Sequence, residues 1–423
     1  MLEARLLHQR GRPEEAERRL LAVLADQPHM LEAWYYLGEV RAHWSSLLAR
    51  PVFEADAALR HALSRTPTQV GMAIHLARLA ALRGDRAELD SLAAAVLRAE
   101  PAADQAREMR ALRAVAHDDA ETLRGIASDL RTGHDATALA LAQSVAAHAG
   151  DAAAASLLSA ALIFPEHARW ARAQGELLAA RLAAAEGRWA IATARLDAAR
   201  DVGPGALLEY RAFFATLPFA PTARGELTRL RAALERAPTG AVASDVSRYR
   251  WPFDSLTAGR RLYLLAVLDL RLGDSVSADA RAAQLEHLQG VSALDAAYAR
   301  ELALPVRSAI ALTRGDPAAA LTALGPPTIG IDSAYPSSHS YPHAQARWLR
   351  AEALRALGRV PDAIRVYASF PDPESYDLPY LAPALRRRAD LLRTLGDRAG
   401  AAALDARAAR LCQQPDPGTR LPP

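Results

Sequence analysis

Apolar residues recur along the chain with the spacing of an amphipathic helix, and a glycine interrupts the recurrence at intervals. In the stretch from His343 to Phe370, apolar residues three and four apart run up to Gly358 and resume after it. Similar runs of about 14 residues flank the other glycines of this kind. The pattern predicts pairs of helices that are joined by a short turn at each glycine.

The residues around these glycines explain the turn. The glycine is followed by Asp or Arg, and a small residue stands five positions on, in eight copies. A glycine ends a helix at low cost because it adopts a left-handed conformation readily, and the Asp of five copies can cap the next helix. The small residue, which is alanine except at Leu89, lets the paired helices approach closely. The eight glycines are Gly11, Gly84, Gly150, Gly187, Gly273, Gly315, Gly358 and Gly396.

The spacing of the pairs resembles the tetratricopeptide repeat (TPR). Pro67 and Pro101, which each close a second helix, are 34 residues apart, and the interval from Pro28 to Pro67 is one period plus five residues. The small residue at repeat position 8 matches Ala4, Gly38, Ala77, Ala180, Ala266, Ser308, Ala351 and Ala389. The resemblance implies an all-α fold, a right-handed superhelical solenoid of TPR-like antiparallel helix pairs. Between Ala102 and Glu235 the repeat is degenerate.

Two segments interrupt the helical pattern and suggest the domain organisation. Residues 237–258 are rich in turn formers, so we expect a linker there between an N-terminal array, residues 1–236, and a C-terminal array, residues 259–423. Residues 325–342 are also irregular, and we expect a long loop within the C-terminal array.

Composition excludes several kinds of chemistry. The chain has 423 residues and a net charge of +3, and all of its basic residues other than histidine are Arg, because Lys is absent, as is Asn. A P-loop lysine, a Schiff-base lysine and the conserved Asn of kinases are therefore impossible. The single Cys412 excludes an internal disulfide. No secretory signal is apparent, and the longest apolar stretch, Ala152–Phe164, is too short to span a bilayer. We expect a cytoplasmic bacterial protein.

Candidate catalytic and metal-ligating residues are few, and each has a simpler interpretation. His339 and His343 are four residues apart, but Pro342 interrupts them, and nearby serines lack a nucleophile elbow. The acidic residues of His117–Asp119 and Gly133–Asp135 stand where helix caps are expected. The run Arg386–Arg388 spreads around a helix, which is typical of a solvated surface and not of a nucleic-acid site. We predict no catalytic residue, cofactor or metal.

The resemblance to TPR proteins implies where a partner would bind. Positions 2, 5, 9, 12 and 13 of the first helix of each repeat line the concave face of this family. Tyrosine, tryptophan and arginine anchors among charged residues suit a bound peptide or helix, although packing between helices is the stronger interpretation for the two aromatic residues. The family's carboxylate clamp for chaperone C-termini requires Lys and Asn, which this chain lacks. Projected onto three repeats, these positions give Glu32, Tyr35, Glu39, His43, Gln345, Trp348, Glu352, Arg355, Arg386, Asp390 and Arg393.

These observations predict a non-catalytic scaffold that binds a peptide or protein partner on its concave face. An alternative is the regulatory or sensor segment of a bacterial signalling protein, since Glu32–Leu59 and Ser375–Ala402 resemble repeat regions that follow Ser/Thr kinase or transcriptional-regulator domains. No kinase glycine-rich or catalytic loop is present, so that resemblance concerns the repeats alone. A third possibility is an enzyme that uses the loop at 325–342. The sequence leaves the oligomeric state and the partner's identity open.

Overall fold

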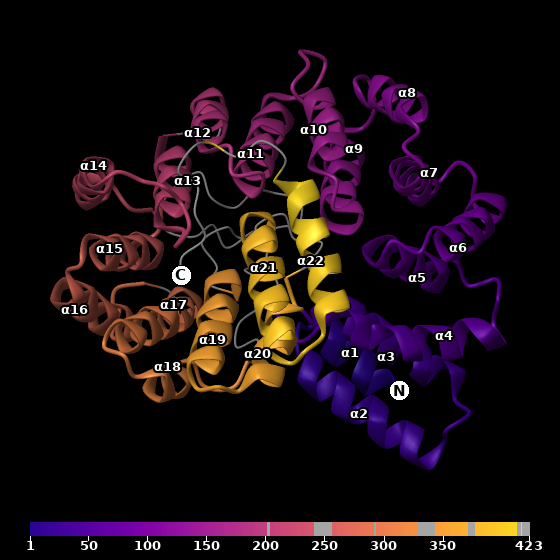
Figure 1. Ribbon diagram of the computed structural model, residues 1–423, viewed down its shortest axis with the longest axis horizontal. Helices are drawn as coiled ribbons and strands as arrows, with labels where there is room; N and C mark the ends of the chain where they lie inside the picture. Colours follow the sequence, from indigo (N-terminus) through magenta and orange to yellow (C-terminus); the bar gives the residue numbers. More distant parts are fainter. Residues whose placement is uncertain are drawn as a thin grey trace. The chain divides into compact units, whose positions relative to one another are not determined.

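Every regular element in the described part of the chain is a helix (Figure 1). The structure is a computed structural model, and it describes residues 1–200, 204–240, 256–291, 293–327, 343–370, 377–412 and 416. None of the described helices is both long and apolar enough to cross a membrane. The all-α fold that the periodicity predicts is thereby confirmed.

The chain divides into two compact units. The first consists of Met1–Leu182 with Ala368–Leu378, and the second of Ala183–Tyr367 with Pro379–Pro423. The predicted division at residues 237–258 stays a prediction, because residues 241–255 lie outside the described part. Residues 328–342, which are most of the predicted loop, lie outside it as well.

The first unit is a succession of short helices in which most helices pack against the one before and the one after, while α8 packs on α10. Helix α9 continues directly into η2, a single π-helical turn, and η1 is a 3-10 helix. The elements are α1 (Leu2–Gln9), α2 (Pro13–Asp26), α3 (Leu31–Trp44), η1 (Val52–Ala55), α4 (Asp56–Arg65), α5 (Val70–Arg83), α6 (Arg86–Ala99), α7 (Asp104–Ala116), α8 (Ala120–Leu130), α9 (Asp135–Ser144), η2 (Val145–Ala149) and α10 (Ala152–Ala161).

The second unit repeats this arrangement. Its helix pairs α15–α16, α17–α18 and α19–α20 pack in succession, Trp348 of α19 contacts Tyr380 of α21, and α21 packs on α22 through Leu381, Leu385 and Leu411. Helix α11 (Arg169–Ala185) contains the division between the units. The others are α12 (Trp189–Ala198), α13 (Pro204–Thr216), α14 (Arg224–Arg236), α15 (Ala258–Leu272), α16 (Ser275–Glu286), α17 (Ala293–Thr313), α18 (Pro317–Leu324), α19 (His343–Ala356), α20 (Val360–Tyr367), α21 (Leu378–Thr394) and α22 (Arg398–Leu411).

The turns between paired helices form as the sequence predicts. All eight motif glycines have a positive φ, between 63° and 83°, which is the left-handed region that favours glycine. The aspartates that follow five of them each accept a hydrogen bond from the backbone N–H three residues on. These N-caps are Asp85, Asp151, Asp274, Asp316 and Asp397. Because both signals are local, the sequence alone identifies the turns.

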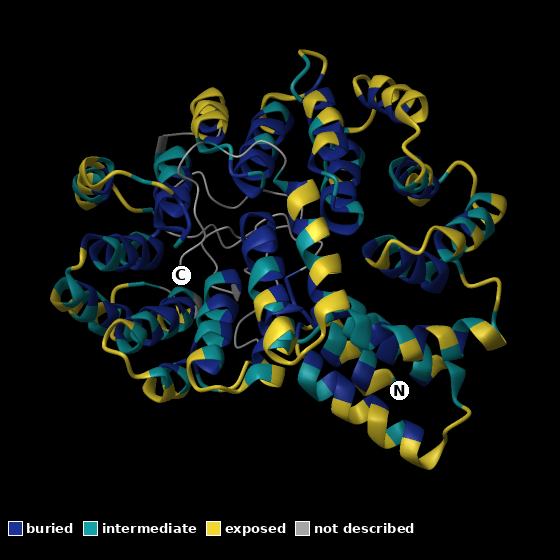
Figure 2. Cartoon of the chain, viewed as in Figure 1, coloured by how far each residue is buried: buried dark blue, intermediate teal, exposed yellow. Residues whose placement is uncertain are grey.

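Small residues allow the paired helices to pack closely. Figure 2 shows that many of the helices carry buried residues on one side and exposed residues on the other. The motif alanines five residues after the glycines are at most 2% exposed, and so is Leu89. The small residues at repeat position 8 are buried too. The predicted role of the small residues in close helix packing is thereby confirmed.

Gly38 is the position where this packing is tightest. A Cβ added to it would lie 2.5 Å from Cδ2 and 2.7 Å from Cγ of Leu59, a fully buried side chain of α4. We expect Gly38→Ala to lower the free energy of unfolding by about 1–3 kcal/mol, although alanine favours a helix, because overpacking outweighs the gain in propensity. Urea unfolding measures this change, and Gly125→Ala is the control, because an added Cβ at Gly125 meets no atom within 4 Å. An unchanged Gly38→Ala midpoint would contradict the prediction.

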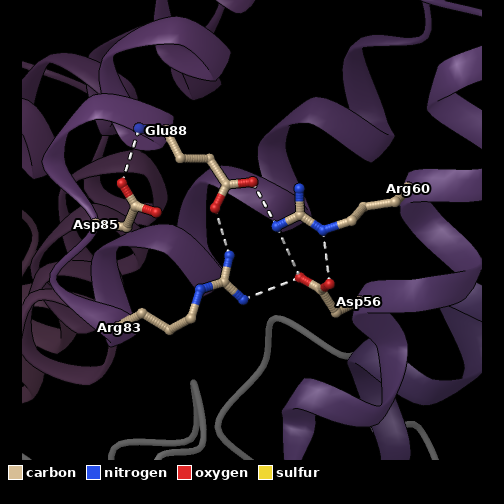
Figure 3. Close-up of polar contacts among 5 residues, drawn as sticks. All are labelled: Asp56, Arg60, Arg83, Asp85 and Glu88. Atoms are coloured by element: carbon tan, nitrogen blue, oxygen red, sulfur yellow. Dashed lines mark hydrogen bonds and ion pairs between the residues drawn. The ribbon is translucent and has the colours of Figure 1, made fainter.

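A network of four charges joins α4, α5 and α6 on the surface (Figure 3). Asp56 accepts hydrogen bonds from Arg60 and Arg83, and Glu88 accepts from both arginines at 2.5 Å. Burial raises the pKa of Asp56, but the two guanidinium groups lower it by more. Glu88 also donates its backbone N–H to the capping Asp85 at 3.0 Å. A surface network of this kind is worth more than its separate pairs, since each charge has two partners.

Candidate functional site

The first unit gathers buried and partly buried polar side chains on the first helices of three successive pairs, α3, α5 and α7. Glu39 comes from α3, His75 and Arg78 from α5, and Glu108 from α7. Charged groups are costly to bury unless they are paired. The way in which each of these groups is paired therefore defines the site.

Glu39 stands between two histidines. His43 lies one turn further along α3, and its Nε2 is 3.5 Å from Oε2 of Glu39. His75 approaches from α5, with Nε2 3.3 Å from the other oxygen, Oε1. The two imidazole rings meet edge to face with their centres 5.0 Å apart. Burial would raise the pKa of Glu39, but the two imidazoles lower it by more, so the carboxylate is ionised.

A second chain of polar contacts starts at Arg78. Its guanidinium donates to both oxygens of Glu108, Nε at 2.7 Å and Nη2 at 2.8 Å. Ser144, at the end of α9, donates its hydroxyl to Glu108. Nδ1 of His148, on the π-helical turn η2, lies 3.0 Å from both the hydroxyl and the backbone oxygen of Ser144. The chain therefore runs from a partly buried cation, through a buried carboxylate and a hydroxyl, to an imidazole.

The direction of the protons in this chain argues against a serine nucleophile. A carboxylate only accepts, so the Ser144 hydroxyl gives its proton to Glu108. His148 then donates from Nδ1 to the hydroxyl oxygen and to the Ser144 carbonyl. A general base must instead accept the proton of the nucleophile. Burial also lowers the pKa of His148 to about 3, so its ring is neutral at pH 7.

The histidines around Glu39 and the polar chain from Arg78 to His148 border one cavity of about 290 Å³. This volume is at the lower end of the range for ligand pockets, roughly 300–1,000 Å³. Apolar side chains provide part of its wall, and histidines, Arg78, Gln143 and Ser144 provide the rest. The lining residues are Ala42, His43, Val52, His75, Arg78, Leu79, Leu82, Ala140, Gln143, Ser144 and His148. The cavity is the size of one or two amino-acid side chains, not of a large cofactor.

The other two residues predicted for this face of the first unit, Tyr35 and Glu32, precede Glu39 on α3. Tyr35 packs on the core cluster of α4 and α5, and burial followed by the charge of Glu39 raises its pKa to about 12. Glu32, one turn earlier, is exposed to solvent in part and lies 3.8 Å from Arg5. Glu39 and His43 thus belong to the cavity region, whereas Glu32 is a surface residue on the same helix.

Glu352 is the centre of the polar residues predicted in the second unit. It accepts from Tyr367 at 2.6 Å, from Arg355 at 2.8 Å and from Arg387 at 3.0 Å. Arg355 is partly exposed, whereas Arg387 is almost buried. Glu352 is therefore already saturated by this chain, and Arg355 is the member of the group that a partner can reach.

Trp348 lies in the core of the second unit, only 4% exposed. Its ring packs against Phe219, Tyr367 and Tyr380, with ring centres 5.5–6.0 Å apart. Gln345, one turn earlier, accepts a hydrogen bond from Tyr263. A partner would not reach the Trp348 ring in this arrangement, so Trp348 is not part of the proposed partner site.

The last three predicted residues are on α21. Asp390 and Arg393 are exposed and form an ion pair with N–O 2.6 Å, and Arg393 also contacts Asp405 of α22. Arg386 is partly buried. Asp390 and Arg393 form an ordinary charged surface. The expected solvated face for the Arg386–Arg388 run is wrong, because all three arginines are only partly exposed and Arg387 is nearly buried against Glu352.

Two acidic segments were expected to cap helices, and only one of them does. Asp119 caps α8 by accepting from the N–H of Thr122, as expected. The expected cap at Gly133–Asp135 is wrong, because α9 has no side-chain cap and Asp135 instead faces Nδ1 of buried His167 at 2.5 Å. His339 and the side chain of His343 lie outside the described part of the chain.

The fold is an all-α array of antiparallel helix pairs. No family model matches the sequence, and no protein of curated function shows significant similarity to it. Among solved structures, the crystal structure of the P58(IPK) TPR domain is similar, at 15% sequence identity. The match covers 96% of this chain and 90% of that one, with a TM-score of 0.23. The description of the helix pairs therefore rests on the turns and packing of this chain itself.

Proposed function

We propose that the chain is a non-catalytic scaffold that binds a peptide or protein partner on the first helices of its pairs. The observation that supports this proposal is the cavity of the first unit, which opens beside α3, α5 and α9 and is bordered by both apolar and polar side chains. Such a lining suits a protein side chain, because the apolar wall provides burial while the polar groups fix orientation. The arrangement of Ser144 and His148 provides no activated nucleophile.

Ala140 offers a direct test, because it is an exposed residue that lines the cavity. We expect Ala140→Trp to fill the cavity and weaken partner binding by tenfold or more, about 1.4 kcal/mol. The partner is first identified by placing a photo-crosslinking amino acid at position 140 and analysing the adducts by mass spectrometry. Binding of the identified protein is then measured by calorimetry.

Ala22 provides the matched control, since it is an exposed alanine of α2 that does not line the cavity. Ala22→Trp should bind the partner like the wild type, and a crosslinker at position 22 should not capture it. Equal affinity for the wild type and the Ala140→Trp variant would overturn the assignment of the cavity as the partner site.

The alternative of a regulatory segment from a signalling protein stays a prediction. It shares the same binding surface and differs in what the partner does. A partner captured at position 140 that carries a kinase or DNA-binding domain would support it.

A further inference from the structure

Among the described residues, one group brings three potential metal ligands together, Glu39, His43 and His75. The ligand atoms of these residues lie within 4.8 Å of one another. Glu39 and His43 are four residues apart, so they share one face of α3, and His75 comes from α5, which packs on α3. Two consecutive helix pairs therefore fix the relative positions of the three side chains.

The distances within this group are compatible with three ligands of one metal ion. The two His–Glu separations are 3.5 Å and 3.3 Å, which is longer than the 2.7–3.2 Å of N–H···O hydrogen bonds. Two ligand atoms that are each 2.0–2.2 Å from a tetrahedral ion lie about 3.3–3.6 Å apart. Both nitrogens are Nε2 atoms, and they face the two oxygens of the same carboxylate.

The surroundings of the group also permit a cation. Arg78 is one turn beyond His75, but its charge is compensated by the two hydrogen bonds to Glu108. His43 and His75 line the cavity, so a bound ion would have open space beside it for a further ligand. Three protein ligands with an open fourth position are the arrangement of catalytic zinc sites, whereas structural zinc sites use four.

We propose that Glu39, His43 and His75 bind one divalent transition-metal ion, with Zn²⁺ as the ion that this ligand set favours. Two imidazoles and one carboxylate suit Zn²⁺ and disfavour Mg²⁺ and Ca²⁺, which prefer oxygen ligands only. The site departs from the sequence-based expectation of no metal. It does not depend on the scaffold proposal, since the three ligands belong to this chain.

Zinc binding to the full-length chain, after treatment with a chelator, tests the proposal. We expect one Zn²⁺ per chain by competition with a chromophoric chelator, and a rise in the thermal unfolding temperature when Zn²⁺ is added. His43→Ala should weaken zinc binding at least tenfold and abolish that rise. The His43 side chain is 48% exposed, so its removal should leave the helices intact, which circular dichroism would verify.

Two further variants make the result specific to this group. Glu39→Gln, which keeps the shape but removes the charge, should weaken binding like His43→Ala. His29→Ala removes an exposed histidine that lies outside the group, and it should bind zinc like the wild type. The proposal is overturned if wild type binds no zinc, or if binding survives in both group variants and is lost in His339→Ala/His343→Ala.

Discussion

Replacing Trp348 by alanine is expected to destabilise the second unit by about 3–5 kcal/mol, the usual cost of removing a buried aromatic side chain. The ring is 4% exposed and contacts Phe219, Tyr367 and Tyr380, which come from three other segments of the unit. Its removal would leave a cavity that these rings cannot close by a small shift, because each is itself packed. Urea unfolding followed by circular dichroism measures the loss.

Trp170→Ala is the control for this prediction. Trp170 is 47% exposed at the start of α11, so its removal leaves no buried cavity. We expect the free energy of unfolding to change by less than about 1 kcal/mol. Hydrogen exchange should show faster exchange in α19 and α21 for Trp348→Ala. If both variants unfold at the same urea concentration as the wild type, the packing described for Trp348 is wrong.

Arg78→Met is expected to cost the first unit about 3–5 kcal/mol, because it leaves the carboxylate of Glu108 buried without its cation. Glu108 is 6% exposed and keeps only the hydroxyl of Ser144 as a partner. Replacing both members of the pair should recover much of the loss, since no charge then remains buried. The double variant Arg78→Met/Glu108→Leu, measured by urea unfolding beside the single one, is therefore the control. A double variant as unstable as the single one would contradict this account.

The pH dependence of stability provides a second measurement of the same pair. Burial raises the pKa of Glu108, but Arg78 lowers it by more, to about 2. A lowered carboxyl pKa stabilises the fold above the unfolded value of about 4.5, and this stability is lost as pH falls toward 2. The double variant should lose less stability than the wild type over that range.

His148 also makes the fold less stable as the pH falls, but over a higher pH range than Glu108 does. Its pKa falls from 6.5 to about 3 in the fold, because burial and the charge of Arg78 disfavour the imidazolium. The unfolded chain therefore binds a proton that the folded chain does not, and stability falls as pH decreases from about 6.5 toward 3. His75, which is partly buried, lines the same cavity as His148.

The turns and the helix pairs could be predicted from the sequence because their causes are local. A glycine with positive φ and an aspartate that caps three residues later are properties of four or five adjacent residues. Position 8 of the repeat could be predicted as well, since a small residue there is required wherever two helices touch. The cap expected at Asp135 failed because a distant side chain, His167, competes for the same carboxylate.

Repeat positions also predict the pair Arg78–Glu108, which a projection onto three repeats leaves out. Glu39 stands at repeat position 9, and the interval of 39 residues between Pro28 and Pro67 carries that position to Arg78. A further 34 residues carry position 5 of that repeat, Ile74, to Glu108. Projection onto every repeat, and not onto three, would have identified both members of the buried pair.

Other features could not be read from repeat positions. His75 and Arg387 both lie two residues before the small residue of their repeat, a position not assigned to the inner face, yet each reaches a carboxylate there. Trp348 occupies an inner-face position, but aromatic rings from α20, α21 and the segment after α13 cover it. Ser144 and His148 depend on the π-helical turn, which follows no repeat period.

Packing between successive helices determines how the chain can gain or lose hairpins during evolution. Each hairpin of the first unit contacts those before and after it, so inserting or removing one disturbs only the junctions at that point. The fold thus tolerates a change in the number of hairpins. The chemistry of the inner face does not, because Glu39, His75 and Glu108 come from three consecutive hairpins and meet only in that order. A shuffled array of the same hairpins would keep its architecture and lose this cavity.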